Sequence, residues 1–163
     1  MHRESKPVSG RIGEIRCWAI CHSTEDEKKV ELAMRTLVGD GIGFEYSSPE
    51  THFGQPMTMI SCRVSGKRAF LNIIRRLPLE QIDILKAQLE ERFDDDSTLQ
   101  IRFDKQFAYE GSLYLSSLIE RDSRKRRDTI DLSVHFTTYP SRRENAVKFA
   151  RKLIEECETE EQG

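Results

Sequence analysis

The sequence has no apolar run as long as a membrane-spanning helix, which needs about 18 to 20 residues. Its first ten residues, MHRESKPVSG, also lack the apolar segment of a signal peptide. We therefore expect a cytoplasmic protein that makes no membrane contact. The sequence contains no HExxH motif, no nucleophile elbow and no phosphate-binding glycine loop. These absences exclude the common motif-bearing hydrolases and nucleotide-binding enzymes, so we predict no catalytic residue and no cofactor.

Zinc-site spacing is missing as well. The four cysteines are Cys17, Cys21, Cys62 and Cys157, and the close pair at 17 and 21 has no second close pair to complete a tetrahedral site. Reduced, buried thiols are the expected state. No metal site is predicted.

Strong net charge is absent too. The 163 residues carry a formal net charge of -2, which by itself argues against a nucleic-acid partner. The total nevertheless combines blocks of opposite sign: residues 61–78 and 97–152 each carry +5, while 79–96 and 153–163 each carry -5. An anion responds to local potential within a Debye length of about 8 to 10 Å. One basic face is therefore compatible with the near-neutral total.

Hydrophobic periodicity predicts an α+β fold with the element order β-α-β-β-α-α-β-β-β-α. Strands are expected at 11–22, 42–47, 57–64, 99–103, 112–116 and 130–136, and helices at 23–38, 70–77, 79–93 and 141–157. The strands alternate polar and apolar residues, which indicates a single, mostly antiparallel or mixed sheet with helices on one face. We expect one domain over residues 1–163, with flexible ends at 1–12 and 158–163.

Asp94, Asp95 and Asp96 raise the question of a metal-dependent hydrolase. A two-metal nuclease needs carboxylates that converge from different elements, whereas adjacent side chains in a turn diverge. Aspartate is favoured in turns because its side chain accepts from nearby backbone N–H groups. His22 and His52 are candidate bases, but the loop around His52 is more typical of a hairpin connection. We favour the turn, and a metal-dependent nuclease or phosphoesterase is the alternative.

Basic and amide side chains on or beside the predicted strands are candidates for contacting RNA. An exposed sheet with guanidinium groups and aromatic rings can hold phosphates by charge and bases by stacking. The candidates are Arg16, Arg63, Arg102, Lys105 and Gln106, with the rings of Tyr109 and Tyr114 nearby. The alternative is a solvated face with cross-strand ion pairs.

Two further segments could add phosphate contacts. We expect residues 104–106 to leave the strand edge as a loop that presents Lys105 and Gln106. Arg142 and Arg143 enter the last predicted helix, whose free N–H groups favour an anion. The basic run RDSRKRRD at 121–128 is a third cluster of this kind. The alternative is that these charges only confer solubility, and that Asp104 and Lys105 pair with each other or with neighbours.

Four segments together resemble a known family: HSTEDEKKVELAMRTL, HFGQPMTMI, LEERFDDDSTLQIRFDKQFAYEG and VHFTTYPSRRENAVKFARKLIE. Over about residues 14–157 and in the same order, they are similar to archaeal RNA-binding proteins regarded as predicted exosome subunits or accessories. One departure is Gln55, where the family pattern is expected to have Asn.

The resemblance implies a fold similar to that of large-subunit ribosomal protein five. It also implies a non-catalytic protein whose partners are RNA and exosome or ribosomal components. A ribosome-associated adaptor is a further alternative. An uncovered sheet edge or face invites pairing, so a homodimer is also considered.

Overall fold

The structure is a computed structural model that describes residues 9–48, 57–116 and 128–162. One five-stranded sheet lies at its centre, with the strand order β2-β3-β1-β5-β4. The strands are β1 (Ser9–His22), β2 (Glu45–Ser47), β3 (Met57–Ser65), β4 (Thr98–Asp104) and β5 (Thr129–Tyr139). Every pair of neighbouring strands is antiparallel. The α+β sheet expected from the sequence is confirmed, and its pairing is antiparallel, not mixed.

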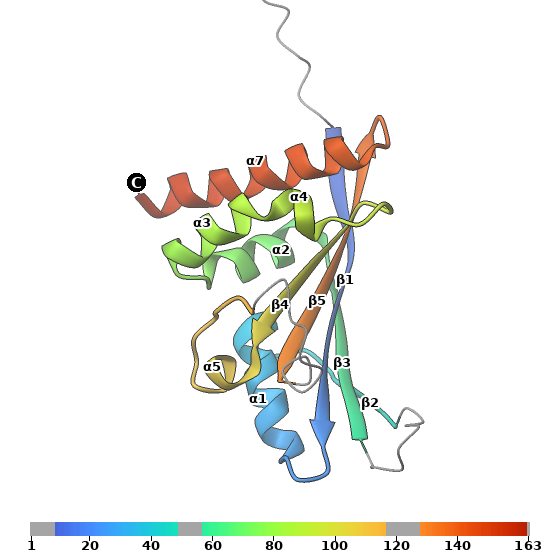
Figure 1. The fold of residues 1–163 in the computed structure, drawn as a ribbon, viewed down its shortest axis with the longest axis vertical. Helices are drawn as coiled ribbons and strands as arrows, with labels where there is room; N and C mark the ends of the chain where they lie inside the picture. Colours follow the sequence, from blue (N-terminus) through green and yellow to red (C-terminus); the bar gives the residue numbers. More distant parts are fainter. Residues whose placement is uncertain (1–8, 49–56, 117–127, 163) are drawn as a thin grey trace, which may run out of the picture.

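Helices of the described residues cover one face of this sheet, as Figure 1 shows. They are α1 (Glu27–Val38), α2 (Gly66–Arg75), α3 (Leu79–Ala87), α4 (Leu89–Arg92), α5 (Lys105–Tyr109) and α7 (Arg143–Gln162). The first and fifth of these lie at one end of the sheet, and the others lie at the opposite end (Figure 1). None of the helices in the described part of the chain is long and apolar enough to cross a membrane.

Strand β1 shows why one face of the sheet is buried. Ile15, Cys17, Ala19 and Cys21 alternate along the strand, and each is at most 2% exposed. Because successive side chains of a strand point to opposite faces, these four residues meet the helices while the intervening ones face away. The sequence pattern thereby fixes which residues are available on the uncovered face.

Phe136 of β5 connects the sheet to the helical layer. Its ring lies 5.6 Å from the ring of Phe70 in α2, in a T-shaped arrangement. The rings of Phe93 and Phe149 lie 5.3 and 6.1 Å from it. Such edge-to-face contacts add roughly 0.5 to 1.5 kcal/mol per pair to the burial of the rings. This cluster holds α2, the end of α4 and the start of α7 against the same strand.

Several expected boundaries differ from the structure. The strand expected at 112–116 is reduced to one bridge, between Phe103 and Leu115. The helix expected at 79–93 is divided into α3 and α4 at Gln88. At the ends expected to be flexible, β1 already begins at Ser9 and α7 continues to Gln162.

The outer edge of β4 is engaged at both of its ends. Asp94 N donates to Thr98 O at one end, beside a bridge between Phe93 and Leu99. At the other end Ser116 N donates to Arg102 O. Covering an edge in this way removes unpaired backbone groups that would otherwise attract another strand.

All four cysteines are free and buried, which confirms the expected reduced thiols. Cys17 and Cys62 lie opposite each other on β1 and β3. The hydrogen bond between them and burial both raise the pKa of Cys17 well above its ordinary value. These thiols belong to the core.

Candidate nucleic-acid interface

The uncovered face of the sheet, which we call the open face, carries three of the predicted arginines. The pairing places Arg16 of β1 directly opposite Arg63 of β3. Arg102 of β4 lies opposite Asp131 of β5, which in turn lies opposite Trp18 of β1. Three positions that are far apart in sequence are therefore brought to one surface.

These arginines are only loosely engaged with carboxylates. Arg63 pairs with Glu14 at 3.1 Å, but the two side chains are 63% and 48% exposed. Arg102 Nε lies 3.8 Å from Asp131 Oδ1. No carboxylate of the described residues lies within 4.0 Å of Arg16. Exposed ion pairs contribute about 0 to 1 kcal/mol, so a phosphate can compete for these guanidinium groups.

Trp18 is an aromatic residue of the open face that the sequence reasoning missed. The guanidinium carbon of Arg16 lies 5.9 Å from the centroid of its ring. Of the two tyrosines proposed instead, Tyr109 belongs to α5. Tyr114 lies beside the end of β4, where its carbonyl accepts from Asp104 N, and its ring centroid is 4.6 Å from that of Phe107. We call Arg16, Trp18, Arg63 and Arg102 the arginine–tryptophan patch. The alternation that turns Ile15, Cys17 and Ala19 inward already indicated that position 18 faces outward.

A buried guanidinium adds to the positive potential near β4. Arg92 is 4% exposed, and its Nε and Nη2 donate to Gln88 Oε1 at 3.1 and 2.7 Å. Burial lowers the pKa of Arg92 to about 10, and the positive charge of Arg102 contributes to the same shift. The nearby carboxylate of Glu91 acts in the opposite direction and raises the pKa of Arg92.

Lys105 occupies a different position from the one expected. Residues 104–106 do not form a loop: Asp104 is the N-cap of α5 and accepts from Phe107 N at 3.0 Å. Lys105 is 7% exposed, and its Nζ donates to Ile20 O at 2.7 Å and to the Glu25 carboxylate at 3.2 and 3.3 Å. The expectation that Lys105 is presented from a surface loop is wrong, because the ammonium group faces inward and is satisfied inside the protein.

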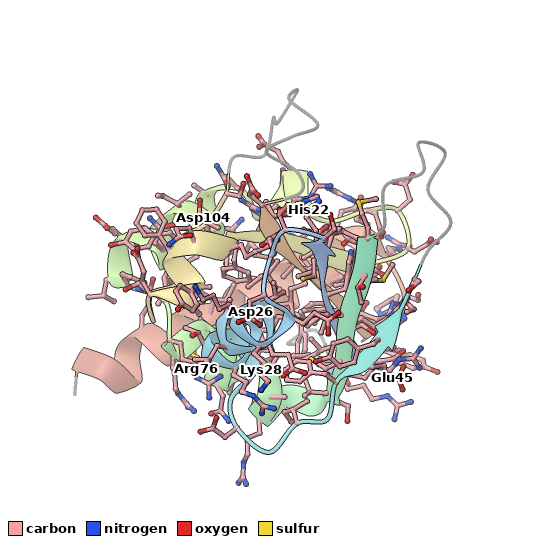
Figure 2. The ribbon with its side chains drawn as sticks, turned by 90° about the horizontal axis from the view of Figure 1, so that it is seen from below. His22, Asp26, Lys28, Glu45, Arg76 and Asp104 are labelled. Carbon is pink, nitrogen blue, oxygen red and sulfur yellow. The ribbon has the colours of Figure 1, made fainter. Side chains whose placement is uncertain are left out.

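Gln106 is exposed and donates to Glu110 at 3.3 Å within α5. Together with Lys105 it borders a hollow of about 400 Å³ between α1 and α5. Glu25, Asp26 and Lys29 line the same hollow, so its charges are mixed. Figure 2 shows Asp26 at the near end of α1, where it is the N-cap. With two carboxylates at its rim, this hollow is a poor place for a phosphate.

The two arginines at the start of α7 have different roles. Arg143 donates from Nε to Phe93 O at 3.3 Å and from Nη2 to Glu90 O. It therefore caps the last carbonyl groups of α4. Arg142 is exposed beside a hollow of about 310 Å³ that Asp95, Asp96 and His135 also line. Of the two, only Arg142 has its side chain directed to the surface.

The aspartate run forms a turn, as the preferred interpretation predicted. Asp94 Oδ1 accepts from Asp96 N at 2.9 Å and from Thr98 N at 3.0 Å, and Ser97 has a φ of 60°. Within residues 9–48, 57–116 and 128–162, no three His, Cys, Asp or Glu side chains are grouped so that they could hold a metal ion. His52, Gln55 and residues 121–127 of the basic run lie outside the described residues.

Comparison with known proteins agrees with a nucleic-acid interface. The chain is 31% identical over 150 residues to the RNA-binding protein PAB1135 of Pyrococcus abyssi, covering 86% of this chain and 92% of that protein. A solved structure, AF2318 from Archaeoglobus fulgidus, has a TM-score of 0.74 and 34% identity, covering 87% of this chain and 99% of that one.

A second solved structure is Mth689, a DUF54 protein from Methanothermobacter thermautotrophicus. It has a TM-score of 0.69 and 30% identity, and the match covers 88% of this chain and 98% of that one. The family model described as RNA binding matches residues 14–136, most of the sheet and helices described above. The chain therefore belongs to this RNA-binding family.

Proposed function

We propose that the protein binds RNA without catalysing a reaction on it, and that it does so through the open face of the sheet. The observation that carries this proposal is the convergence of Arg16, Arg63 and Arg102 on one uncovered surface with only weak carboxylate partners. Arginine is suited to phosphate because its planar group donates in pairs to two oxygens. Family membership supports RNA as the ligand.

Arg142 is proposed as a secondary phosphate contact, because its side chain is exposed immediately before α7, although Asp95 and Asp96 line the same hollow and oppose an anion there. It lies next in sequence to Arg143, whose guanidinium group is engaged with α4. Lys105 is left out of the proposed interface because its ammonium group is buried.

The salt dependence of RNA binding tests the proposed surface. Each phosphate contact contributes about one unit to the slope of log affinity against log salt, somewhat less on single strands. We expect Arg16→Ala, Arg63→Ala and Arg102→Ala each to flatten this slope by about that amount and to weaken binding for every sequence. Arg68→Ala is the matched control, since Arg68 is an exposed arginine of α2 on the helical side. If the salt slope changed in Arg68→Ala and in none of the three sheet variants, the RNA interface would lie on the helical side and the proposal would be wrong.

We further propose that the protein works beside a larger RNA-processing assembly, the archaeal exosome. A small protein with few phosphate contacts binds RNA weakly on its own. If it also docks on an assembly that holds the same RNA, the effective concentration of the RNA at its binding surface rises. Co-purification from native cells tests this step. Recovery of exosome components supports it, whereas recovery of ribosomal particles alone would favour a ribosome-associated adaptor.

A metal-dependent nuclease is the competing function, and RNA incubated with Mg²⁺ or Mn²⁺ distinguishes the two. The proposal predicts intact RNA. Cleavage that is lost in Asp95→Ala would overturn the non-catalytic assignment. A homodimer is a separate possibility, and light scattering of the purified protein tests it. Pairing through the outer edge of β4 is disfavoured, because backbone groups at both ends of that edge already have partners.

A further inference from the structure

Trp18 lies at the centre of the open face. Its strand, β1, is the middle strand of the sheet, and its direct neighbours across the sheet are Ser61 of β3 and Asp131 of β5. Cys17 and Ala19, on either side of it in sequence, are buried on the helical face. The indole therefore points to the side that the described helices leave uncovered (Figure 1).

The immediate surroundings of the ring differ from those of a core aromatic residue. The cross-strand neighbours are small or charged, and Arg16 approaches the ring from the same strand. Tryptophan in a packed core is enclosed by apolar side chains, whereas this ring is half-buried, with Ser61, Asp131 and Arg16 beside it and one apolar neighbour, Ile20, further along β1. A flat aromatic surface beside guanidinium groups matches a nucleobase with its phosphate.

We propose that the arginine–tryptophan patch binds single-stranded RNA, with one base stacked on Trp18 and the flanking phosphates held by the arginines. This inference rests on the proposed function and names the ligand class of that surface. In a duplex each base is already stacked between its neighbours, so no base face is free for the indole. An unpaired strand can turn a base out onto an aromatic side chain.

The arginines stand on both sides of the ring. Arg63 lies one strand away on β3, opposite Arg16, and Arg102 lies two strands away in the other direction. With neighbouring strands about 4.8 Å apart, the flanking cations lie roughly 5 and 10 Å across the sheet from β1. A strand of RNA that places one base on Trp18 thus meets a cation on either side of that base.

Arg16 links the two kinds of contact. In the free protein its guanidinium carbon is 5.9 Å from the centroid of the Trp18 ring, a cation–π contact that an exposed site holds only weakly. A stacked base is a stronger partner for an indole than an exposed cation. When a base stacks on the indole, it displaces the guanidinium group of Arg16, which can then contact the phosphate of the same nucleotide. One residue therefore exchanges an aromatic partner for an anionic one when RNA binds.

The chain has a single tryptophan, so its fluorescence reports on this site alone. We would titrate the protein at low salt with oligoadenylate, and separately with the duplex of oligoadenylate and oligouridylate. Stacking of adenine on the indole is expected to quench the emission, and the duplex is expected to leave it nearly unchanged. Anisotropy of labelled RNA measures binding independently of the tryptophan.

Variants complete the test. Trp18→Leu is expected to weaken single-strand binding about tenfold or more, the effect of losing one stacked base, while Trp18→Phe keeps a ring and most of the affinity. Tyr109→Leu, which removes a ring from the helical side, is the matched control. Circular dichroism of each variant establishes that it is folded.

The outcomes separate the two proposals. RNA that binds without quenching, equally well as single strand and duplex and equally well to Trp18→Leu, would overturn the stacking inference and leave RNA binding intact. Failure of every RNA to bind at low salt would overturn both. Quenching by the single strand, together with the loss in Trp18→Leu, would establish the site.

Discussion

Nζ of Lys105 lies 3.2 Å from a carboxylate oxygen of Glu25, an ion pair between residues 80 positions apart. It joins the start of α5 to the turn that connects β1 and α1, and the side chain of Lys105 is only 8% exposed. The same ammonium group also donates to Ile20 O. The sequence suggested that Lys105 contacts RNA at the surface, but its side chain instead stabilises the fold by joining these two segments.

Replacing Lys105 is expected to affect stability and not RNA affinity. Lys105→Ala removes the ammonium partner of the Ile20 carbonyl and of the partly buried Glu25 carboxylate, which keeps only its contacts with His22. We expect the free energy of unfolding to fall by about 2 kcal/mol, measured by urea denaturation. Gln106→Ala, at the exposed neighbouring position, is the control and should change stability by less than about 0.5 kcal/mol. A stable Lys105→Ala protein with a flatter salt slope for RNA would contradict this role.

Asp94 and Asp95 are expected to respond differently to substitution, although they are adjacent. Asp94 accepts two backbone hydrogen bonds in the turn before β4, so Asp94→Ala should cost about 1 kcal/mol. Within the described residues no backbone N–H donates to the Asp95 side chain, which makes Asp95→Ala the matched control. Thermal denaturation of both variants with and without Mg²⁺ checks this prediction. If Mg²⁺ stabilised the parent protein and neither variant, the run would be a metal site and the turn role would fail.

The ion pair between Lys86 and Glu158 predicts a loss of stability at high pH. Nζ of Lys86 in α3 lies 2.8 Å from the carboxylate of Glu158 in α7, and this hydrogen bond raises the pKa of Lys86 above 10.5. A cation whose pKa is higher in the folded state stabilises the protein below the unfolded value. That stabilisation disappears as the pH rises through the folded value.

Lys86→Met should therefore lower the free energy of unfolding by about 1 kcal/mol at pH 8. The difference from the parent protein should shrink above about pH 10.5. Lys152→Met removes an exposed lysine of α7 and serves as the control. Denaturant midpoints at several pH values measure both variants. A difference that persists unchanged to the highest pH would rule out the ion pair as its source.

The thiols are expected to be unreactive in the folded protein. All four are buried, and burial raises the pKa of Cys21 while the hydrogen bond with Cys62 and burial raise that of Cys17. The thiolate is the reactive form, so burial opposes modification of all four thiols, and the raised pKa opposes it further at Cys17 and Cys21. The hydrogen bond with Cys17 lowers the pKa of Cys62, so that thiol is protected by burial and not by its ionisation. A thiol-reactive chromophore should detect four groups in guanidinium chloride and none rapidly in the native protein. One fast native thiol would show that part of the core opens.

Much of the fold follows from local patterns. The alternation of apolar residues predicted β1, β3, β4 and β5 within a few residues, and the 3.6-residue spacing predicted α1 and α7. The strand order could not be predicted, because local periodicity carries no information on which distant strands pair, such as β1 with β5. The short helix α5 was also missed, since five residues carry too little periodicity to distinguish a helical turn from a loop.

For the candidate site too, local patterns predicted which way side chains face, but not which distant residues they contact. Alternation correctly turned Arg16, Arg63 and Arg102 outward, and applied consistently it would also have turned Trp18 outward and Lys105 inward. The partner of Lys105 could not be found in this way, because contacts between distant residues depend on how the elements pack.

The position of β1 has a consequence for how the chain folds. This strand precedes the other described strands in the chain, yet it pairs along one edge with β5, from Ser9 opposite Tyr139 to Ala19 opposite Ile130. Contacts between distant parts of a chain must first overcome the entropy of closing the intervening loop, so they form late and slowly. While the ribosome is still translating, that edge of β1 has no native neighbour and is open to wrong partners. Commitment to the native state therefore waits for the strand that begins at Thr129, and a nascent chain that stops short of it lacks the partner that completes the sheet.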